Sequence, residues 1–451
     1  MENLKNKKPY FNICLPSEVQ DLSRRNFLKT AVSFSAAAYL HKFLGSGSAF
    51  GQIQQPSFPP QRKLVWINLS GGWDILESTD PKQSANDGLQ LMYDFGQAQT
   101  LAGTSDVKIG RWLPRMAQLG NDIIVVRGIA MGTTSHPAGT LYMDTGILSN
   151  AGRVNAASIS SIIASESTAT IPIIQLTGGS EPLIDRGLLK PISIVRASNL
   201  DLYRSMYPST ADQIARRLEM LDYLKTSVAT LTGEVGVSDR LTSLATAEAK
   251  IRGQLQNNVG SKLYLSDAEL QPYTSQLARS SQYKDAANSF ALASKLIRND
   301  LVTSINIGLG GFDTHTSQVQ RLNPLMNALD GLVSAFVREL KDAGKLDSTL
   351  IVLWSDFGRT PRINASAGRD HWPVGGSMLI GGGLKGGRAV GGTDDYLRAL
   401  SINPDTGAMD ANGTQISPFH IGGTALQLCL GSAYMTYRPY LQSLNVLTQL
   451  R

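Results

Sequence analysis

The chain alternates short apolar runs with turn-forming residues over two stretches, from residue 63 to about 200 and again from residue 302. Continuously apolar runs of strand length occur at 64–69, 122–127, 171–176, 302–307 and 350–354. Such runs are typical of strands buried on both faces of a parallel sheet, because a strand with one wet face alternates apolar and polar residues. The pattern therefore predicts an α/β fold with a mostly parallel sheet flanked by helices.

The stretch between these two regions has a different spacing of apolar residues. From about 201 to 298, apolar residues recur at helical spacing among many charged ones, with Ile214, Leu218, Leu221 and Leu224 on one stripe. This predicts an inserted helical subdomain. A long helix is expected at 318–343. The stretch 379–418 is rich in glycine and turn residues, which favours loops that line a site.

The first 49 residues have the order of an export signal. A polar stretch ends in Ser23-Arg24-Arg25-Asn26-Phe27-Leu28-Lys29, which resembles the twin-arginine consensus. The apolar run at 30–44 is shorter than the roughly 18–20 residues of a membrane-spanning helix. Small residues follow, and we expect cleavage after Ala49. The alternative is an uncleaved leader that anchors the protein to the membrane.

This leader predicts a domain order and a location. Residues 1–49 form the twin-arginine signal peptide, 50–62 a Gln/Pro-rich linker and 63–451 the α/β domain. The twin-arginine translocase is then a partner during export, and the folded protein is periplasmic or secreted. We expect no transmembrane span in the mature chain, because no later segment is long and apolar enough.

Charge and cysteine content narrow the function classes. Of 451 residues, 42% are hydrophobic and 17% charged, as in an ordinary globular protein. The formal net charge of +6 comes mostly from the leader, whose seven basic and three acidic residues leave 35 basic and 33 acidic residues in the body. Charge therefore implies neither nucleic acid nor an anionic membrane surface as a partner. Cys14 lies in the leader and Cys429 is the other cysteine, which excludes an intramolecular disulfide after processing and a tetrathiolate metal site.

Acidic residues follow three of the predicted strands. Asp74 follows the first strand through Gly71-Gly72, Asp313 and His315 follow the 302–307 strand, and Asp356 follows the 350–354 strand. The carboxyl ends of parallel strands meet at one edge of a sheet, where ligands bind. A single acid after a strand is often a helix cap or turn residue. Three at one edge, one of them with a histidine, favour a functional site.

The histidines support the same interpretation. Outside the leader the chain has His136, His315, His371 and His420, each beside turn and polar residues. Imidazole and carboxylate together are the usual ligands of zinc, manganese or iron, whereas carboxylates alone favour magnesium or calcium. A mixed Asp/His metal site is therefore predicted. His420 is the weakest candidate, because nothing acidic is near it and the residues after it have the pattern of a helix start.

Four motifs carry a family resemblance. They are Gly310-Gly-Phe-Asp-Thr-His315, Ser355-Asp-Phe-Gly-Arg-Thr-Pro-Arg362, Gly368-Arg-Asp-His-Trp-Pro373 and the glycine-rich stretch 381–394. Together they resemble the exported bacterial family called domain of unknown function 1501, over about residues 63–435. That family is similar in fold to the alkaline phosphatase and sulfatase superfamily. The resemblance implies an alkaline-phosphatase-like fold, and it specifies the fold better than the activity.

The resemblance also implies roles for residues. By position the metal ligands are Asp74, Asp313, His315, Asp356 and His371. The implied cofactor is a divalent metal ion, with zinc, manganese and calcium all open. The segment 133–146 is similar to the nucleophile segment of sulfatases, which places Ser135, and less well Thr134, at the nucleophile position. The start of a helix there would stabilise a bound oxyanion through its free N–H groups.

The resemblance leaves other roles open. His136 is a further candidate for the reacting centre. Arg359, Arg362 and Arg369 are candidates to offset charge on the transferred group, although Arg359 and Arg362 fit a salt bridge to a loop carboxylate equally well. Trp73 and Trp372 either form walls for an organic substrate or pack the loops, and packing is the better fit.

Three departures from the superfamily pattern affect the activity. Phe357 follows Asp356 where the superfamily has a histidine ligand, and Gly139 stands where an arginine is expected. Asp313 and His315 are separated by one residue, where the superfamily pair is separated by three. These changes indicate one tight metal or lost catalysis. Two functions remain open. One is an exported metal-dependent hydrolase of phosphate or sulfate esters on a small-molecule, glycan or lipid substrate. The other is a catalytically degenerate, metal-stabilised protein that binds a glycan or acts in envelope assembly.

Overall fold

The computed structural model describes residues 62–83, 89–149, 154, 156–184, 194–196, 200, 204, 210–232, 248, 251–277, 281–437 and 441–448. The predicted signal peptide and all of the predicted linker except Arg62 lie outside the described residues. Contacts between residues divide the chain into two units, one with Met1–Gln55 and Ala211–Gln256, the other with Pro56–Thr210 and Asn257–Arg451. Helix α6 (Ala211–Thr232) belongs to the first unit. The second unit contains the sheet and every candidate site residue that is described.

The second unit is built on an eight-stranded sheet with the order β12-β4-β11-β8-β1-β7-β5-β6. Its strands are β1 (Lys63–Asn68), β4 (Ile123–Ala130), β5 (Ile171–Gln175), β6 (Ile194–Arg196), β7 (Val302–Gly308), β8 (Thr349–Trp354), β11 (Val374–Gly381) and β12 (Arg388–Gly391). The neighbours β8, β1, β7, β5 and β6 run parallel, as do β12 and β4, whereas β11 is antiparallel to β4 and β8. All five runs predicted from apolar pattern form strands of this sheet, so the mostly parallel α/β fold is confirmed.

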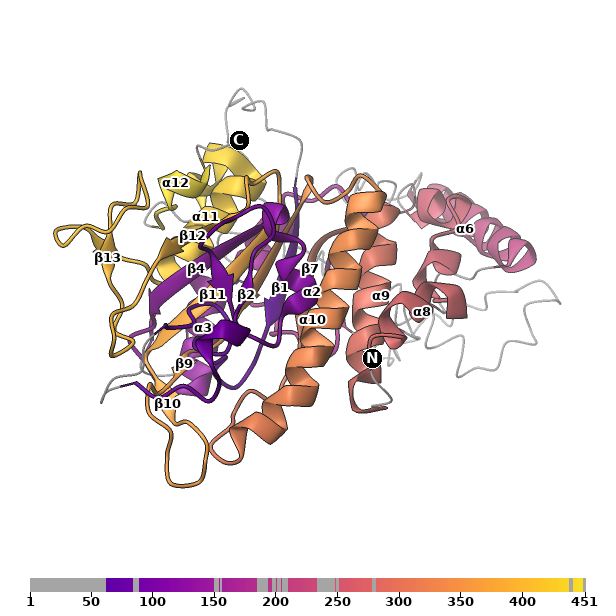
Figure 1. Cartoon of the computed structure of the whole chain (residues 1–451). Coiled ribbons are helices and arrows are strands. Elements are labelled where there is room, and N and C mark those ends of the chain that lie inside the picture. The colour runs from indigo at the N-terminus through magenta and orange to yellow at the C-terminus, as the bar shows by residue number, and fades with distance from the viewer. Residues whose placement is uncertain are drawn as a thin grey trace, which may run out of the picture. The chain divides into compact units, whose positions relative to one another are not determined.

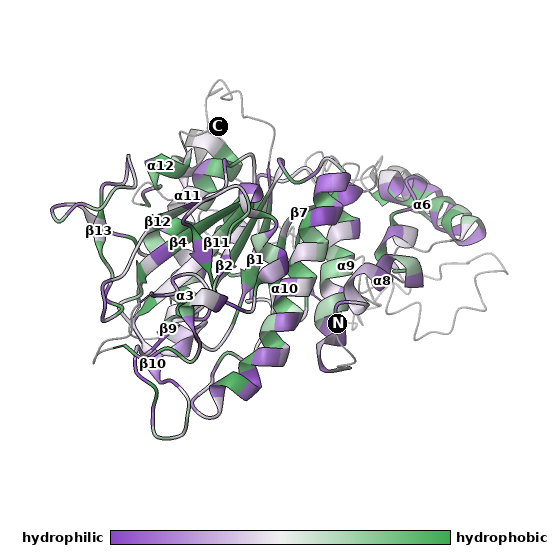
Figure 2. Ribbon diagram, in the orientation of Figure 1, coloured by the Kyte–Doolittle hydropathy of each residue, from purple (hydrophilic) through white to green (hydrophobic). Residues whose placement is uncertain are grey.

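Both faces of the sheet are covered. In β1, Val65 and Ile67 pack into one apolar core, while Leu64 and Trp66 pack into a second core on the opposite face. The first core is completed by α2 (Pro114–Ala117), α9 (Lys284–Arg298) and α10 (Gln318–Asp342), and the second by α3 (His136–Thr145), α4 (Ile159–Ser165) and α11 (Pro418–Leu430). Figure 1 shows α9 and α10 side by side along the sheet, and Figure 2 shows the apolar colouring of the central strands. This burial explains the continuous apolar runs.

The long helix predicted at 318–343 is confirmed as α10, which ends at Asp342. The remaining described elements are short, apart from α8 (Asp267–Thr274), which packs against α9. They are η3 (Phe95–Gln97), β2 (Gln99–Thr100), β3 (Lys108–Ile109), η4 (Gly120–Asp122), η6 (Val259–Leu263), η7 (Ser281–Tyr283), β9 (Gly358–Arg359), β10 (His371–Trp372), β13 (Ser401–Ile402), β14 (Thr414–Gln415), η8 (Gly431–Thr436) and α12 (Asn445–Thr448). Every helix among the described residues is too short or too polar to span a bilayer.

Two strands of the sheet arise where the pattern favours loops. Strand β11 ends inside the glycine-rich stretch 379–418 and β12 lies within it. Gly376 of β11 serves close packing instead of a turn, because a Cβ atom there would lie 2.1 Å from the Oγ1 atom of Thr79. Glycine in a strand interior often marks such a close approach.

Candidate metal centre

The three strands that precede the predicted acidic ligands are neighbours, in the order β8-β1-β7. The turn after β1 draws their ends together. Gly71 and Gly72 have φ values of +116° and +87°, and their N–H groups donate to Oδ1 of Asp356 over 3.1 and 2.7 Å. A Cβ atom on Gly71 would lie 2.4 Å from the backbone nitrogen of Asp313. Only glycine fits this turn, which joins the ends of β1, β7 and β8.

Three histidine rings converge on one oxygen of Asp313. The Nε2 atoms of His136, His315 and His371 lie 3.7, 3.0 and 3.3 Å from Oδ1 of Asp313. The Nε2 atoms of His315 and His371 are also only 3.0 Å apart. The rings come from the start of α3, the loop after β7 and β10, which are distant in sequence. The fold thus assembles a cluster of three imidazoles and one carboxylate.

The other ring nitrogen of each histidine faces an oxygen acceptor. Nδ1 of His136 contacts Oδ2 of Asp356, Nδ1 of His315 lies 2.8 Å from Oδ1 of Asp370, and Nδ1 of His371 lies 2.9 Å from the carbonyl oxygen of Thr134. Carboxylate and carbonyl oxygens only accept hydrogen bonds, so each Nδ1 must carry the proton. In a neutral ring the lone pair then lies on Nε2, the atom that faces the cluster.

This arrangement fits a bound metal ion. The ligand atoms of His136, Asp313 and His371 all lie within 4.8 Å of one another. Tetrahedral bonds of about 2.0–2.2 Å to nitrogen and oxygen place neighbouring ligand atoms about 3.3–3.5 Å apart. The Nε2 atoms of His136, His315 and His371 lie at similar distances, 3.7, 3.0 and 3.3 Å, from Oδ1 of Asp313. Nε2 of His136 is buried and has no hydrogen-bond partner among the residues that the structure describes. A divalent cation would satisfy this atom and relieve the repulsion between the lone pairs.

Arg359 neutralises the carboxylate of the cluster. Its Nη2 atom donates to Oδ1 of Asp313, and the guanidinium, with no exposed surface, also donates to the carbonyl oxygens of Gly71, Gly72 and Arg369. Burial acts to raise the pKa of Asp313, but the hydrogen bond and charge of Arg359 hold that pKa below its usual value. Asp313 is therefore ionised, as a metal ligand must be.

Asp356 contacts the cluster only through His136. It is 1% exposed, and its Oδ1 atom accepts from Gly71, Gly72 and Ser355, while Oδ2 accepts from the Nδ1–H group of His136. Each oxygen already has partners within the chain. At this position, predicted as a metal ligand, the carboxylate lies behind the ring of His136 and contacts its Nδ1 atom.

Asp74 faces away from the cluster. Its Oδ1 atom accepts from the backbone of Leu76, and Oδ2 accepts from Gln318 and lies 3.1 Å from Nε of Arg369. Arg369 has no exposed surface and donates to the carbonyl oxygens of Gln90, Thr360 and Pro361. The structure thus brings Asp74 and Arg369 to each other and not to the three histidines.

The remaining predicted residues are spread around the cluster. Ser135 is exposed and is the N-cap residue of α3, although its hydroxyl makes no capping hydrogen bond. Arg362 is exposed on the loop before β10. Trp73 is 1% exposed in the apolar core, and Nε1 of Trp372 donates to the carbonyl oxygen of Leu397, so both tryptophans pack the loops. His420 caps α11, as expected for a helix start.

Phe357 stands where the resemblance implies a histidine ligand. Its ring is fully buried, with centroids 4.6 Å from His136 and 4.5 Å from His371. The phenyl ring therefore supports two of the three imidazoles and fills the space beside them. Packing explains why glycine stands at position 139, because a Cβ atom there would lie 2.0 Å from the carbonyl oxygen of Asp356. No arginine fits at that position.

Sequence reasoning missed the residues that fix the histidines. Asp370 and the carbonyl group of Thr134 hold His315 and His371, and Asn364 donates to both Asp370 and the carbonyl oxygen of His315. The hydrogen bond from His315 is the main cause that lowers the pKa of Asp370. Asp370 directly precedes His371 in the motif, which is a signal for its place near the site. The partner of Asp370, however, is His315, which the fold brings beside it from a distant part of the sequence.

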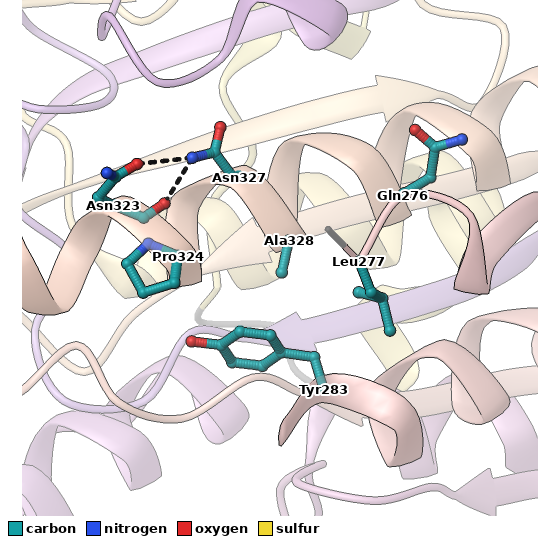
Figure 3. Close-up of a pocket in the computed structure, with 7 residues that line it drawn as sticks. All are labelled: Gln276, Leu277, Tyr283, Asn323, Pro324, Asn327 and Ala328. Carbon is teal, nitrogen blue, oxygen red and sulfur yellow. Dashed lines mark hydrogen bonds between the residues drawn. The ribbon is translucent and has the colours of Figure 1, made fainter. Parts of the chain in front are cut away.

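A cavity of about 240 Å³ lies elsewhere on the same unit. Figure 3 shows Tyr283 and Leu277 opposite Pro324 and Ala328 of α10, with the amides of Gln276, Asn323 and Asn327 around them. Nδ2 of Asn327 donates to both oxygens of Asn323. No residue of the histidine cluster lines this cavity, and its walls are neutral.

No curated protein matches this chain. Similar solved structures include the soluble domain of lipooligosaccharide phosphoethanolamine transferase A from Neisseria meningitidis, with 10% identity, a TM-score of 0.39, and coverage of 87% of this chain and 93% of that one. The PsFucS1 sulfatase from Pseudoalteromonas sp. has 11% identity, a TM-score of 0.35 and coverage of 92% and 74%. A protein in the alkaline phosphatase superfamily from Vibrio parahaemolyticus has 11% identity, a TM-score of 0.33 and coverage of 83% and 74%.

The family comparison covers a narrower span than the motifs indicate. It includes Asp313, His315, Asp356 and His371, and it leaves out His136 and the strands before it. Residues 189–408 match the model of the family described as Protein of unknown function (DUF1501), which confirms the family resemblance that the motifs of this chain carry.

Proposed function

We propose that this protein is an exported metal-dependent hydrolase of phosphate or sulfate esters, with one divalent ion held by His136, Asp313, His315 and His371. The observation that supports it is the convergence of three Nε2 atoms on Oδ1 of Asp313, each with its Nδ1 proton fixed by an oxygen acceptor. A donor set of three nitrogens and one oxygen favours zinc or manganese over calcium.

A divalent ion bound there supplies Lewis acidity, since it polarises an ester oxygen and lowers the pKa of bound water from about 15.7 towards about 7. The chain's own groups set the geometry. Asp356 fixes His136, the carbonyl group of Thr134 fixes His371, and Arg359 keeps Asp313 ionised. In this proposal Asp356 and Asp74 are not ligands, and the site holds one ion instead of two.

Ser135 is the candidate nucleophile. It directly precedes His136, is exposed, and its hydroxyl is not used in capping α3. The N–H groups in the first turn of α3 lack partners within the helix and favour an anion beside it. Among the three predicted arginines, Arg362 is the exposed one, and Arg359 and Arg369 have no exposed surface. We therefore assign contact with a small-molecule, glycan or lipid ester to Arg362.

The second candidate is a metal-stabilised protein without catalysis. It is favoured by the full hydrogen bonding of Asp356 and Asp74, by Phe357 in the place of a ligand, and by the lack of room for an arginine at Gly139. Such a site would hold the ends of β7 and β8 and the start of α3 together without turning over a substrate.

An activity assay separates the two candidates. The full chain, loaded with zinc or manganese, is assayed on an aryl phosphate and an aryl sulfate beside the Ser135→Ala and His371→Ala variants. The hydrolase proposal predicts turnover of one ester class that both variants abolish. One equivalent of bound metal with no turnover that depends on Ser135 would favour the non-catalytic candidate and reject Ser135 as nucleophile.

We also propose that residues 1–49 direct this protein through the twin-arginine translocase after it has folded, into the periplasm or the medium. Folding before export lets the cell load the metal in the cytoplasm. Replacement of Arg24 and Arg25 by lysine should leave the chain in the cytoplasm, as measured by fractionation, while the matched Lys7→Arg, Lys8→Arg variant is exported. Unchanged export of the twin-lysine variant would contradict this route.

A further inference from the structure

The three oxygen acceptors that hold the histidines differ in burial and in whether they belong to a side chain or to the backbone. Asp356 is buried at the end of β8, and the acceptor for His371 is a backbone carbonyl group. The side chain of Asp370, in contrast, is 56% exposed and lies on the segment 364–370 between β9 and β10. His315 is thus the histidine of the cluster whose Nδ1 proton is held by an exposed side chain.

The same segment binds the backbone that carries His315. The N–H groups of Ser317 and Gln318 donate to the carbonyl oxygens of Ser366 and Ala367 over 3.0 and 2.9 Å. In the other direction, the backbone N–H group of Arg369 donates to the carbonyl oxygen of Thr314 over 3.1 Å, and Nδ2 of Asn364 donates to the carbonyl oxygen of His315 over 2.9 Å. Ring and backbone of His315 are therefore fixed by one element.

The segment is shaped for this contact. Oδ1 of Asn364 accepts from the N–H groups of Ser366 and Gly368, each over 3.0 Å, which closes the loop on itself. A Cβ atom on Gly368 would lie 2.1 Å from the carbonyl carbon of His315. Only glycine lets the two backbones approach so closely.

We propose that the segment 364–370 is a positioning element for the metal centre, in which Asp370 and Asn364 set the proton and the orientation of His315. The inference rests on the proposed metal site and deepens it. Asp370 acts through His315. A carboxylate that accepts a hydrogen bond from Nδ1–H keeps the ring proton on Nδ1, so Nε2 stays unprotonated and is a stronger ligand. Asp370 and Asn364 are thus positioning residues.

The test is metal affinity. Zinc affinity of the full chain is measured by competition with a chromogenic chelator, and the absorption spectrum of bound Co²⁺ reports the coordination. Loss of a group that holds a metal-binding histidine typically costs about 10- to 100-fold in affinity. We expect a loss of that size for Asp370→Ala and a smaller one for Asp370→Asn, because the amide oxygen still accepts the Nδ1 proton. Asp410→Ala is the matched control, since Asp410 caps a loop turn by accepting from Asn412.

The outcomes distinguish this inference from the proposed function. Wild-type zinc affinity and an unchanged Co²⁺ spectrum in Asp370→Ala would overturn the positioning role while the metal centre stands. Gly368→Ala is the second variant, and it should weaken zinc binding by displacing the backbone of His315. If wild type binds neither zinc nor Co²⁺, the proposed metal site fails, and this inference fails with it.

Discussion

Asp144 carries a buried carboxyl group near the end of α3. It lies on α3, and its Oδ1 atom accepts from Nε1 of Trp66 over 2.9 Å and from Oγ of Ser180 over 2.8 Å. Burial raises the pKa of Asp144 from 3.8 to about 7, although both hydrogen bonds act to lower it. The folded protein therefore holds a proton on Asp144 that the unfolded chain releases near pH 4.

This proton links stability to pH. Between pH 4 and 7 the folded state binds more protons than the unfolded state, so the free energy of unfolding falls as pH rises, by on the order of 4 kcal/mol in total. An asparagine side chain at this position would keep the acceptor oxygen and have no proton to lose. We predict that Asp144→Asn matches wild type near pH 4 and is more stable at pH 8, measured by urea unfolding. The exposed Asp106→Asn is the control, and parallel pH profiles for wild type and Asp144→Asn would contradict the prediction.

Single side chains also show where sequence reasoning stops. Asp74, Asp313 and Asp356 were all expected at one sheet edge, and the strand order brings them there because their strands are neighbours. Which of them faces the histidines depends on hydrogen bonds from Gly71, Gly72 and Gln318, which are set by turn geometry and packing. Apolar pattern carries no information about these bonds.

Helix α3 is positioned by a contact that admits no side chain. Gly139 packs against the backbone of Asp356, the residue that holds His136 at the start of the same helix. Gly139→Ala should push α3 away from the end of β8, lower stability by about 1–3 kcal/mol and weaken zinc binding, as measured by thermal melts and chelator competition. Gly253→Ala is the control, because no atom lies within 4 Å of a Cβ atom there. Wild-type stability and zinc affinity in Gly139→Ala would show that α3 is not held in this way.

The strands that sequence predicts and those it misses differ in composition. Runs such as β1 and β8 are apolar throughout, since both faces are covered by helices, and pattern alone identifies them. Strand β11 contains Gly375 and Gly376, which have the pattern of a turn, and its pairing with β4 and β8 comes from long-range contacts. The β9–β10 hairpin that sets His371 opposite Arg359 is two residues long on each side, too short for any periodic signal.

For the protein as a whole, a metal that binds the folded state alone should raise its stability. The four proposed ligands come from the start of α3, the loop after β7 and β10, so the site exists only in the folded chain. At a free ion concentration about 100 times the dissociation constant, binding adds about 2.7 kcal/mol. We predict that a chelator lowers the melting temperature of wild type and leaves that of the His136→Ala, His371→Ala variant unchanged. An equal effect of chelator on both proteins would place the metal elsewhere.

The most direct measurement is the metal content of the purified full chain, by elemental analysis after dialysis against zinc or manganese. The proposed centre predicts one equivalent of ion per chain in wild type and in the His420→Asn control. The His136→Ala, His371→Ala variant lacks two ligands and should hold less than about a tenth of an equivalent. No bound ion in wild type, or the same content in wild type and the double variant, would contradict the metal centre at Asp313.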